Sequence, residues 1–284
     1  MTYEVAIIGS GPAGISAALC LKALNKNFIW FSSRTVSKKV GQAELIKNYP
    51  GLPDITGAEL AWTFQNHYEG MNIKLTQKVV TGVYDTSEGF TLLADNEQYE
   101  AKSVILCLGV QTNKPLAGEE EFVGRGVSYC ATCDGFLYKD KTIAVLCYDK
   151  QFEHEISFLA GIAKKVFVMP MYRGYEINFP NAEVIMKNPV RLSGDMRLKK
   201  IGFKDGEIEV DGLFVLKGAI SPSTLLHGLQ TENGHIVVNR DCSTNISGVF
   251  AAGDCTGRPY QYVKAAGEGN VAAHSAVEYL SKLK

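Results

Sequence analysis

The sequence has no excess of charge of either sign and no long apolar run. Lys and Arg together number 29 and Asp and Glu 30, which gives a formal net charge of -1. This balance argues against a nucleic-acid partner, because binding a polyanion needs a basic surface. No apolar stretch reaches the roughly 18 residues that a membrane-spanning helix requires. We therefore expect a protein that binds neither nucleic acid nor membrane.

The sequence also lacks internal repeats, low-complexity segments and the basic and apolar parts of a secretory signal. Residues 5–8 instead begin a strand pattern at once. Five of the seven cysteines stand alone in apolar or turn-like surroundings, which is typical of a reducing cytosol. We expect a cytoplasmic protein. The five isolated cysteines are Cys20, Cys107, Cys147, Cys242 and Cys255.

Length and pattern indicate two α/β domains. The chain has 284 residues, of which 46% are hydrophobic and 21% charged, an ordinary globular composition. Strand and helix patterns alternate, which predicts sheets layered with helices. We expect strands over 5–8, 28–31, 91–94, 103–108, 142–146, 166–169 and 248–252, and helices over 12–24, 152–163 and 267–280.

The order of these elements suggests that one domain is inserted into the other. Pro115 interrupts the strand pattern and restricts the residue before it, which favours a hinge there. Strand 248–252 then returns to the style of the first domain. We predict an α/β fold of two Rossmann-like, three-layer domains. The first comprises 1–112 and 243–284, and the second, 113–242, is inserted in it.

A glycine-rich loop follows the first strand and opens the first helix, the context in which GxGxxG predicts a dinucleotide site. Gly9 permits the tight turn, Gly11 allows close approach of a pyrophosphate, and Gly14 allows close packing of helix on strand. The helix N-terminus offers free N–H groups to the phosphates. The candidate binding residues here are Gly9, Ser10, Gly11, Pro12, Ala13 and Gly14.

The acidic residue expected at the end of strand 28–31 is absent. Ser32 and Ser33 follow instead, and their hydroxyls could bond a ribose or a phosphate. Near the other end of the chain, strand 248–252 runs into Gly253 and Asp254. This arrangement is typical of flavoproteins, in which the Asp meets the ribityl chain. It therefore favours FAD over NAD, although a plain Gly-Asp turn would give the same letters.

Residues 130–134, Cys-Ala-Thr-Cys-Asp, contain the single CxxC of the chain. A zinc site would need two further ligands, and the five histidines show no ligand spacing. A structural disulfide does not suit a reducing compartment. A redox dithiol, in which one sulfur attacks a partner disulfide and the other resolves the mixed disulfide, fits best. Asp134 could move the proton that a leaving thiolate requires or could cap the following turn.

Taken with the flavin motifs, the run 124–136 (Gly-Arg-Gly-Val-Ser-Tyr-Cys-Ala-Thr-Cys-Asp-Gly-Phe) resembles the low-molecular-weight thioredoxin reductases. The resemblance spans nearly the whole chain. It implies FAD as cofactor, thioredoxin as partner and a homodimer. It also implies that Cys133 lies nearest the flavin, that Cys130 attacks thioredoxin, and that Asp134 is the acid.

The same resemblance implies further cofactor contacts, some of them in segments that lie along the isoalloxazine ring in that family. For Tyr262, stacking beside the flavin and a place in the core remain equally open. The additional candidates are Gln42, Asn48, Val80, Gly109, Tyr262 and Val263.

The chain departs from this family after strand 142–146. Where the family has a GxGxxA loop for NADPH, this sequence has Cys147, Asp149 and Phe152. Asp149 would set a negative charge beside a phosphate, and Phe152 would prevent close helix packing. Only Arg173 remains of the basic run that holds the 2′-phosphate. The pattern resembles the ferredoxin-dependent flavin thioredoxin reductases, so we expect ferredoxin as electron donor and not NADPH.

Three other interpretations remain at this point. The enzyme could use NAD(P)H bound at a divergent site. It could hold a second flavin in the altered domain, where Tyr148, Phe152 and Tyr172 could supply an aromatic platform. The Cys pair could also belong to a non-catalytic sensor that reports oxidation to a protein partner.

Overall fold

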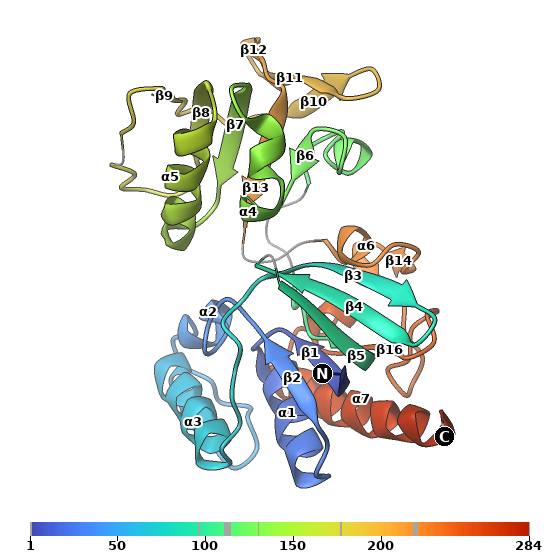
Figure 1. The fold of residues 1–284 in the computed structure, drawn as a ribbon. Coiled ribbons are helices and arrows are strands. Elements are labelled where there is room, and N and C mark those ends of the chain that lie inside the picture. Colours follow the sequence, from blue (N-terminus) through green and yellow to red (C-terminus); the bar gives the residue numbers. More distant parts are fainter. Residues whose placement is uncertain are drawn as a thin grey trace. The chain divides into compact units, whose positions relative to one another are not determined.

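A computed structural model describes residues 2–95, 97–110, 115–129, 131–176, 178–217 and 221–283, and of Cys133 the backbone only. The chain divides into two compact units. The first joins Met1–Gln111 with Leu225–Lys284, and the second is Thr112–Thr224. In Figure 1 the first unit therefore carries both the blue and the red ends of the chain.

The first unit is built on a six-stranded mixed sheet of order β2-β1-β5-β4-β3, with β16 added beside β5. Its strands are β1 (Thr2–Ile8), β2 (Phe28–Phe31), β3 (Val80–Thr86), β4 (Gly89–Ala94), β5 (Glu97–Leu106) and β16 (Val249–Ala251), with a hairpin of β14 (Thr231–Glu232) and β15 (His235–Ile236). Its helices are α1 (Pro12–Ala23), α2 (Lys38–Gly41), α3 (Gly57–Gly70), η4 (Asp254–Thr256) and α7 (Tyr262–Lys282).

The carboxyl end of strand β5 lies between β1 and β16. It pairs in parallel with β1, with Ile8 opposite Leu106, and in parallel with β16, with Ala251 opposite the same Leu106. Its earlier part pairs with β4 in the antiparallel sense. Because β1, β5 and β16 end at the same level, the loops that follow them lie at one edge of the sheet, where α/β proteins bind ligands.

Helices α1 and α7 pack together on this sheet. A Cβ added at Gly269 of α7 would lie 2.0 Å from the carbonyl oxygen of Ala13 in α1, so the two backbones are in close contact there. Helix α7 begins at Tyr262, five residues before the predicted start at Gly267. The prediction was wrong because Gly267 suggested a boundary, whereas a Cβ there would meet nothing within 4 Å and the helix continues through it.

The second unit is built on a five-stranded, wholly parallel sheet of order β6-β13-β7-β8-β9. Buried strands of this kind read as continuous apolar runs. Its strands are β6 (Val127–Ser128), β7 (Thr142–Cys147), β8 (Lys165–Pro170), β9 (Ala182–Val184) and β13 (Gly212–Leu216), with an antiparallel sheet of β10 (Arg191–Gly194), β11 (Leu198–Phe203) and β12 (Gly206–Glu209). Its helices are η1 (Glu120–Phe122), α4 (Ala131–Asp134), η2 (Gly135–Tyr138), η3 (Lys150–Phe152) and α5 (Glu153–Ile162).

The α/β class is confirmed, but the second domain boundary differs from the expected one. The segment 225–242 belongs to the first unit, not to the inserted one, and the short helix α6 (Pro222–Leu225) spans the boundary. Leu226 forms a bridge with Val83 of β3, and the Gln230 amide donates to Asn245 Oδ1 over 2.9 Å. Within the described residues no helix has the length and apolarity needed to cross a membrane.

Candidate active site

The loop after β1 has the geometry of a dinucleotide site. Gly9 adopts φ +116°, and a Cβ on it would lie 2.1 Å from the carbonyl oxygen of Cys107. A Cβ on Gly14 would lie 1.9 Å from the carbonyl oxygen of Gly9. At Gly11 the space is open, with only Ser37 Cβ at 4.0 Å. Two glycines are thus required by packing, while the third leaves room in front of the first turn of α1 for a pyrophosphate.

Hydroxyl groups connect this loop to the end of β2. Ser10 is buried and donates its hydroxyl to the carbonyl oxygen of Arg34 over 2.8 Å. Since that uses the single proton of Ser10, Ser32 donates to Ser10 in the 2.8 Å contact between the two hydroxyls. Ser33, the next residue, is half-buried. The structure thereby brings the predicted site residues Ser10 and Ser32 together where β2 ends.

The Gly-Asp motif lies against the glycine loop, although the two are separated by most of the chain. Gly253 follows β16 with φ +90°, and a Cβ on it would lie 3.0 Å from Ala13 Cβ. Asp254 comes next and is half-buried at the start of η4. Burial raises the pKa of Asp254, and the charges of Lys39 and Lys264 oppose this rise.

The other predicted contacts lie around the same edge. Tyr262 is half-buried at the start of α7 and donates its hydroxyl to the carbonyl oxygen of Lys39 over 3.3 Å. Burial and the nearby charge of Asp254 raise its pKa. Asn48 donates its amide to Gln261 Oε1 over 2.7 Å, which joins the segment before α3 to the start of α7.

The remaining predicted residues differ in accessibility. Gly109, soon after β5, has φ +65° and open space where a Cβ would be. Val80 begins β3 and is buried, which suits a backbone contact more than a side-chain contact. Gln42, at the end of α2, and Val263, in the first turn of α7, are exposed.

Residues 130–134, which contain the CxxC and form the redox segment, belong to the second unit. Cys130 lies outside the described residues, and for Cys133 only the backbone, within α4, is described. The Ala131 amide between them donates to Glu155 Oε2 of α5 over 3.4 Å. Asp134 is half-buried at the end of α4, and its side chain does not cap the turn η2 that follows. Of its two predicted roles, capping is therefore not observed.

In the loop after β7, where a second nucleotide would bind, side chains of the protein form hydrogen bonds with one another and with the backbone. The Cys147 thiol donates to the carbonyl oxygen of Asp149 over 3.3 Å, and the Asp149 carboxylate accepts from the Gln151 amide over 3.1 Å. Glu153 and Glu155 lie in the first turn of α5. Tyr172, which follows β8, donates its hydroxyl to Glu153 over 2.8 Å. Burial raises the pKa of Cys147 to about 11.

Sequence reasoning missed two charged residues of the first site. Lys264 and Glu268 in α7 form an ion pair of 3.0 Å beneath the Gly253–Asp254 turn. Their four-residue spacing is visible in the sequence, but Lys264 lies before the predicted start of the helix at Gly267, and such pairs usually lie on a solvated face.

Comparison with known proteins agrees with this geometry. A family model described as pyridine nucleotide-disulphide oxidoreductase matches residues 3–150 and 181–269. The thioredoxin reductase of Aquifex aeolicus is 33% identical over 99% of this chain and 94% of that protein.

Two solved structures of a ferredoxin-flavin thioredoxin reductase from Clostridium acetobutylicum are also similar. One is 46% identical with a TM-score of 0.90 and covers 99% of each chain. The other is 43% identical with a TM-score of 0.92 and covers 100% of this chain and 99% of that one.

The fold and the site define a two-unit oxidoreductase of the dinucleotide-binding α/β class, acting on a disulfide. The chain belongs to the pyridine nucleotide-disulphide oxidoreductase family and is a homologue of thioredoxin reductases. Membership implies a flavin cofactor, and the open space at Gly11 together with the contact of Gly253 with Ala13 fits one.

Proposed function

We propose that this protein reduces thioredoxin with electrons from reduced ferredoxin, through FAD and a Cys130–Cys133 disulfide. The observation that carries the choice of donor is the loop after β7. It presents the Asp149 carboxylate and, one turn on, Glu153 and Glu155, where NADPH would need glycines and N–H groups. Carboxylates at that point repel a pyrophosphate, and Tyr172 bonded to Glu153 fills space beside them.

FAD is the proposed cofactor of the first unit. The N–H groups of the first turn of α1 face the open space at Gly11, which suits a pyrophosphate. Asp254, at the same sheet edge, is available for the ribityl chain. When bound, the flavin takes up electrons singly and delivers them in pairs, which a one-electron donor and a disulfide together require.

The redox residues have separate roles in this proposal. Cys133 receives the electron pair from the flavin side, which opens the disulfide. Cys130 attacks the thioredoxin disulfide as a thiolate and forms the mixed disulfide, which Cys133 then resolves. Asp134 supplies the proton that the leaving thiolate requires. The proposal takes the active form to be a homodimer.

The direction of transfer is downhill. Plant-type ferredoxins have potentials of about -400 mV and thioredoxin of about -270 mV. A difference of ~130 mV corresponds to about 6 kcal/mol for two electrons. Reduced ferredoxin therefore has ample driving force to reduce thioredoxin through this enzyme.

The test is anaerobic visible spectroscopy of the purified protein. NADPH, NADH and catalytically reduced ferredoxin are added in turn while the oxidised-flavin band is followed. We expect bleaching with ferredoxin alone and recovery on addition of oxidised thioredoxin. Rapid bleaching with NADPH would overturn the choice of donor, and two flavins per chain would point to a second flavin in the altered unit.

The variants Cys130→Ser and Cys133→Ser complete this test. Each should keep the flavin spectrum and still bleach with ferredoxin, because the flavin unit is unchanged. Neither should reduce thioredoxin over repeated turnovers. Retained turnover in either variant would refute the disulfide path. A wild-type protein that completed only one turnover would instead behave as a redox sensor.

A further inference from the structure

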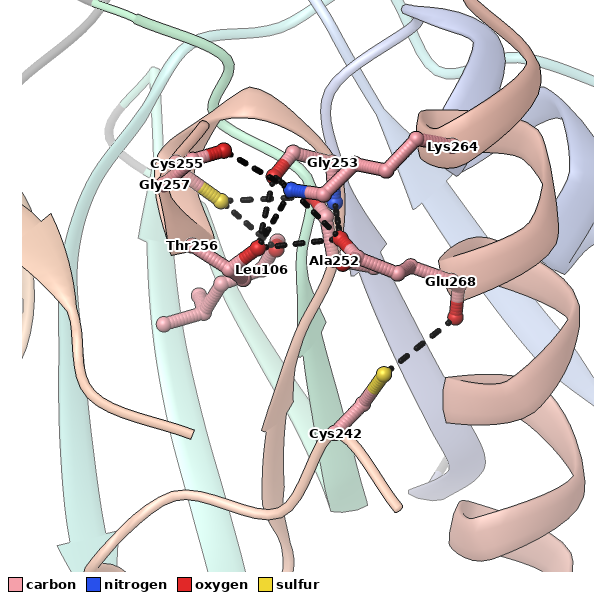
Figure 2. A network of polar contacts seen from close by, with 9 residues as sticks. All are labelled: Leu106, Cys242, Ala252, Gly253, Cys255, Thr256, Gly257, Lys264 and Glu268. Atoms are coloured by element: carbon pink, nitrogen blue, oxygen red, sulfur yellow. Dashed lines mark hydrogen bonds and ion pairs between the residues drawn. The ribbon is translucent and has the colours of Figure 1, made fainter. Parts of the chain in front are cut away.

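Asp254 lies in a turn formed by residues 253–257, and Lys264 of α7 contacts this turn at three atoms (Figure 2). Its ammonium group donates to the carbonyl oxygen of Gly253 over 2.8 Å and to that of Gly257 over 2.9 Å. It also lies 2.9 Å from Thr256 Oγ1. A single cation therefore bridges the first and last residues of the turn.

Glu268, one helical turn further along α7, completes the arrangement. Its Oε2 accepts from the Gly253 amide over 2.8 Å and lies 2.9 Å from Thr256 Oγ1 and 3.0 Å from Lys264 Nζ (Figure 2). Gly253 thus has its N–H bound to an anion and its C=O bound to a cation. Both groups of one peptide residue are fixed by side chains of the same helix.

This fixation acts on a backbone conformation that is not intrinsically favoured. Gly253 has φ +90° and ψ -152°, a region open essentially to glycine. Glycine also has the largest conformational freedom of any residue, so without external contacts it would sample other conformations. The two charged side chains remove that freedom at the residue directly before Asp254.

Helix α7 is itself fixed to the glycine loop. Gly269, next to Glu268, lies against the carbonyl oxygen of Ala13, and Gly253 lies against the side chain of the same Ala13. The helix thereby connects the Gly253–Asp254 turn to the loop after β1. The relative position of the two halves of the flavin site is set through these contacts.

We propose that Lys264 and Glu268 are positioning residues, which hold Asp254 at the distance from the glycine loop that flavin binding requires. This inference rests on the proposed FAD site. It assigns to the pair a role beyond ordinary helix stabilisation, because each member contacts the turn as well as its partner. Removing either should loosen the turn in the absence of flavin and weaken FAD binding.

The chain contains a matched control on the same helix. Lys282 and Glu278 form an ion pair of 2.7 Å with the same four-residue spacing, but their side chains are 70% and 69% exposed. Those of Lys264 and Glu268 are 19% and 27% exposed. The variant Lys282→Met removes a lysine and a helix ion pair from α7 without touching the turn.

The experiment compares full-length wild type with Lys264→Met, Glu268→Ala, Glu268→Gln and Lys282→Met. FAD is removed, and its dissociation constant is measured by titration. We expect Lys264→Met and Glu268→Ala to weaken FAD binding at least about tenfold, the effect of losing hydrogen bonds to charged groups. Glu268→Gln keeps an acceptor oxygen and should fall between these variants and wild type. Lys282→Met should stay within about twofold.

Hydrogen exchange of the flavin-free proteins gives a second readout that needs no cofactor. Amides of residues 252–257 should exchange faster in Lys264→Met and Glu268→Ala than in wild type and Lys282→Met. Unchanged FAD affinity in Lys264→Met and Glu268→Ala would overturn the proposal, and so would weaker affinity without faster exchange of these amides. If Lys264→Met fails to fold, Glu268→Gln and Thr256→Val test the same contacts.

The two proposals fail in different ways. A wild-type protein that binds no FAD would refute the cofactor assignment, whatever the variants do. A wild-type protein that binds FAD with variants of the same affinity would refute only the role of Lys264 and Glu268.

Discussion

Lys217 and Glu119 form a buried ion pair of 2.8 Å in the second unit, with side chains 6% and 1% exposed. Tyr129 donates its hydroxyl to Glu119 Oε1 over 2.7 Å, and the Leu116 amide donates to Oε2 over 2.8 Å. Burial and the charge of Glu119 raise the pKa of Tyr129. Tyr129 directly precedes Cys130 in the sequence, so these contacts stabilise the backbone that leads into the redox segment.

Replacing Lys217 by Met should be strongly destabilising. It leaves the Glu119 carboxylate buried without its cation, a change that costs about 3–5 kcal/mol when one partner of a buried pair is removed. The measurement is the free energy of unfolding of the second unit in urea.

The control for this prediction is Lys187→Met. Lys187 pairs with Asp205 over 2.9 Å with side chains 53% and 70% exposed, and such pairs contribute about 0–1 kcal/mol. The double variant Lys217→Met/Glu119→Gln, which removes both charges, should recover part of the loss. Equal effects of Lys217→Met and Lys187→Met would contradict the assigned burial.

At the scale of elements, the close contact between α1 and α7 depends on Gly269 but not on Gly267, although the two glycines stand only two residues apart. Replacing Gly269 by Ala sets a methyl group against the Ala13 carbonyl oxygen, so the helices must separate. A Cβ at Gly267 would have no atom within 4 Å, so the variant Gly267→Ala should stabilise α7 by up to about 1 kcal/mol.

Thermal unfolding of the two variants measures this difference. Gly269→Ala should unfold at a lower temperature than wild type and bind FAD more weakly, because Ala13 belongs to the glycine loop. Gly267→Ala should unfold at the same temperature as wild type or higher. A Gly269→Ala protein with unchanged unfolding would show that the helices are not in the described contact.

Elements with a strong local pattern were predictable from the sequence. The strand at 28–31 agrees with β2 residue for residue, because an apolar run ends there in polar residues. Pro12 and the glycines around it gave the start of α1. Strands β10 to β12 were not predicted, since they are short strands that pair with one another in a small separate sheet and carry little alternation of their own.

The site was predictable where the backbone geometry is encoded by a few adjacent residues. The GxGxxG loop and the Gly253–Asp254 turn are of this kind, because the backbone conformation or the packing requires glycine at Gly9, Gly14 and Gly253. The contacts of Lys264 and Glu268 were not predictable, because they depend on a helix being placed over a turn. The order of the charges differs between this pair and the Glu278–Lys282 pair, but that order does not tell which of the two pairs is buried against a turn.

At the scale of the whole molecule, each unit has a hydrophobic core of its own. The inserted unit, Thr112–Thr224, is one continuous segment, whereas the two parts of the first unit share a sheet through β5 and β16. We therefore expect the first unit to fold without the second.

A shortened chain tests this expectation. Residues 112–224 are replaced by a short Gly-Ser linker, which keeps β5 and β16 in one molecule. The product should unfold cooperatively in urea and bind FAD with an affinity close to that of the full chain. A product that is unfolded by circular dichroism would mean that the first unit needs the inserted one.

The pairing of β16 with β5 has a consequence for synthesis on the ribosome. Strand β16 can pair with β5 in the sheet of the first unit only after the whole inserted unit has been translated. The same holds for the packing of α7 on the glycine loop. The inserted unit can therefore fold while the flavin unit is still incomplete, and the nascent chain must keep its amino-terminal strands from aggregating until the last helix emerges.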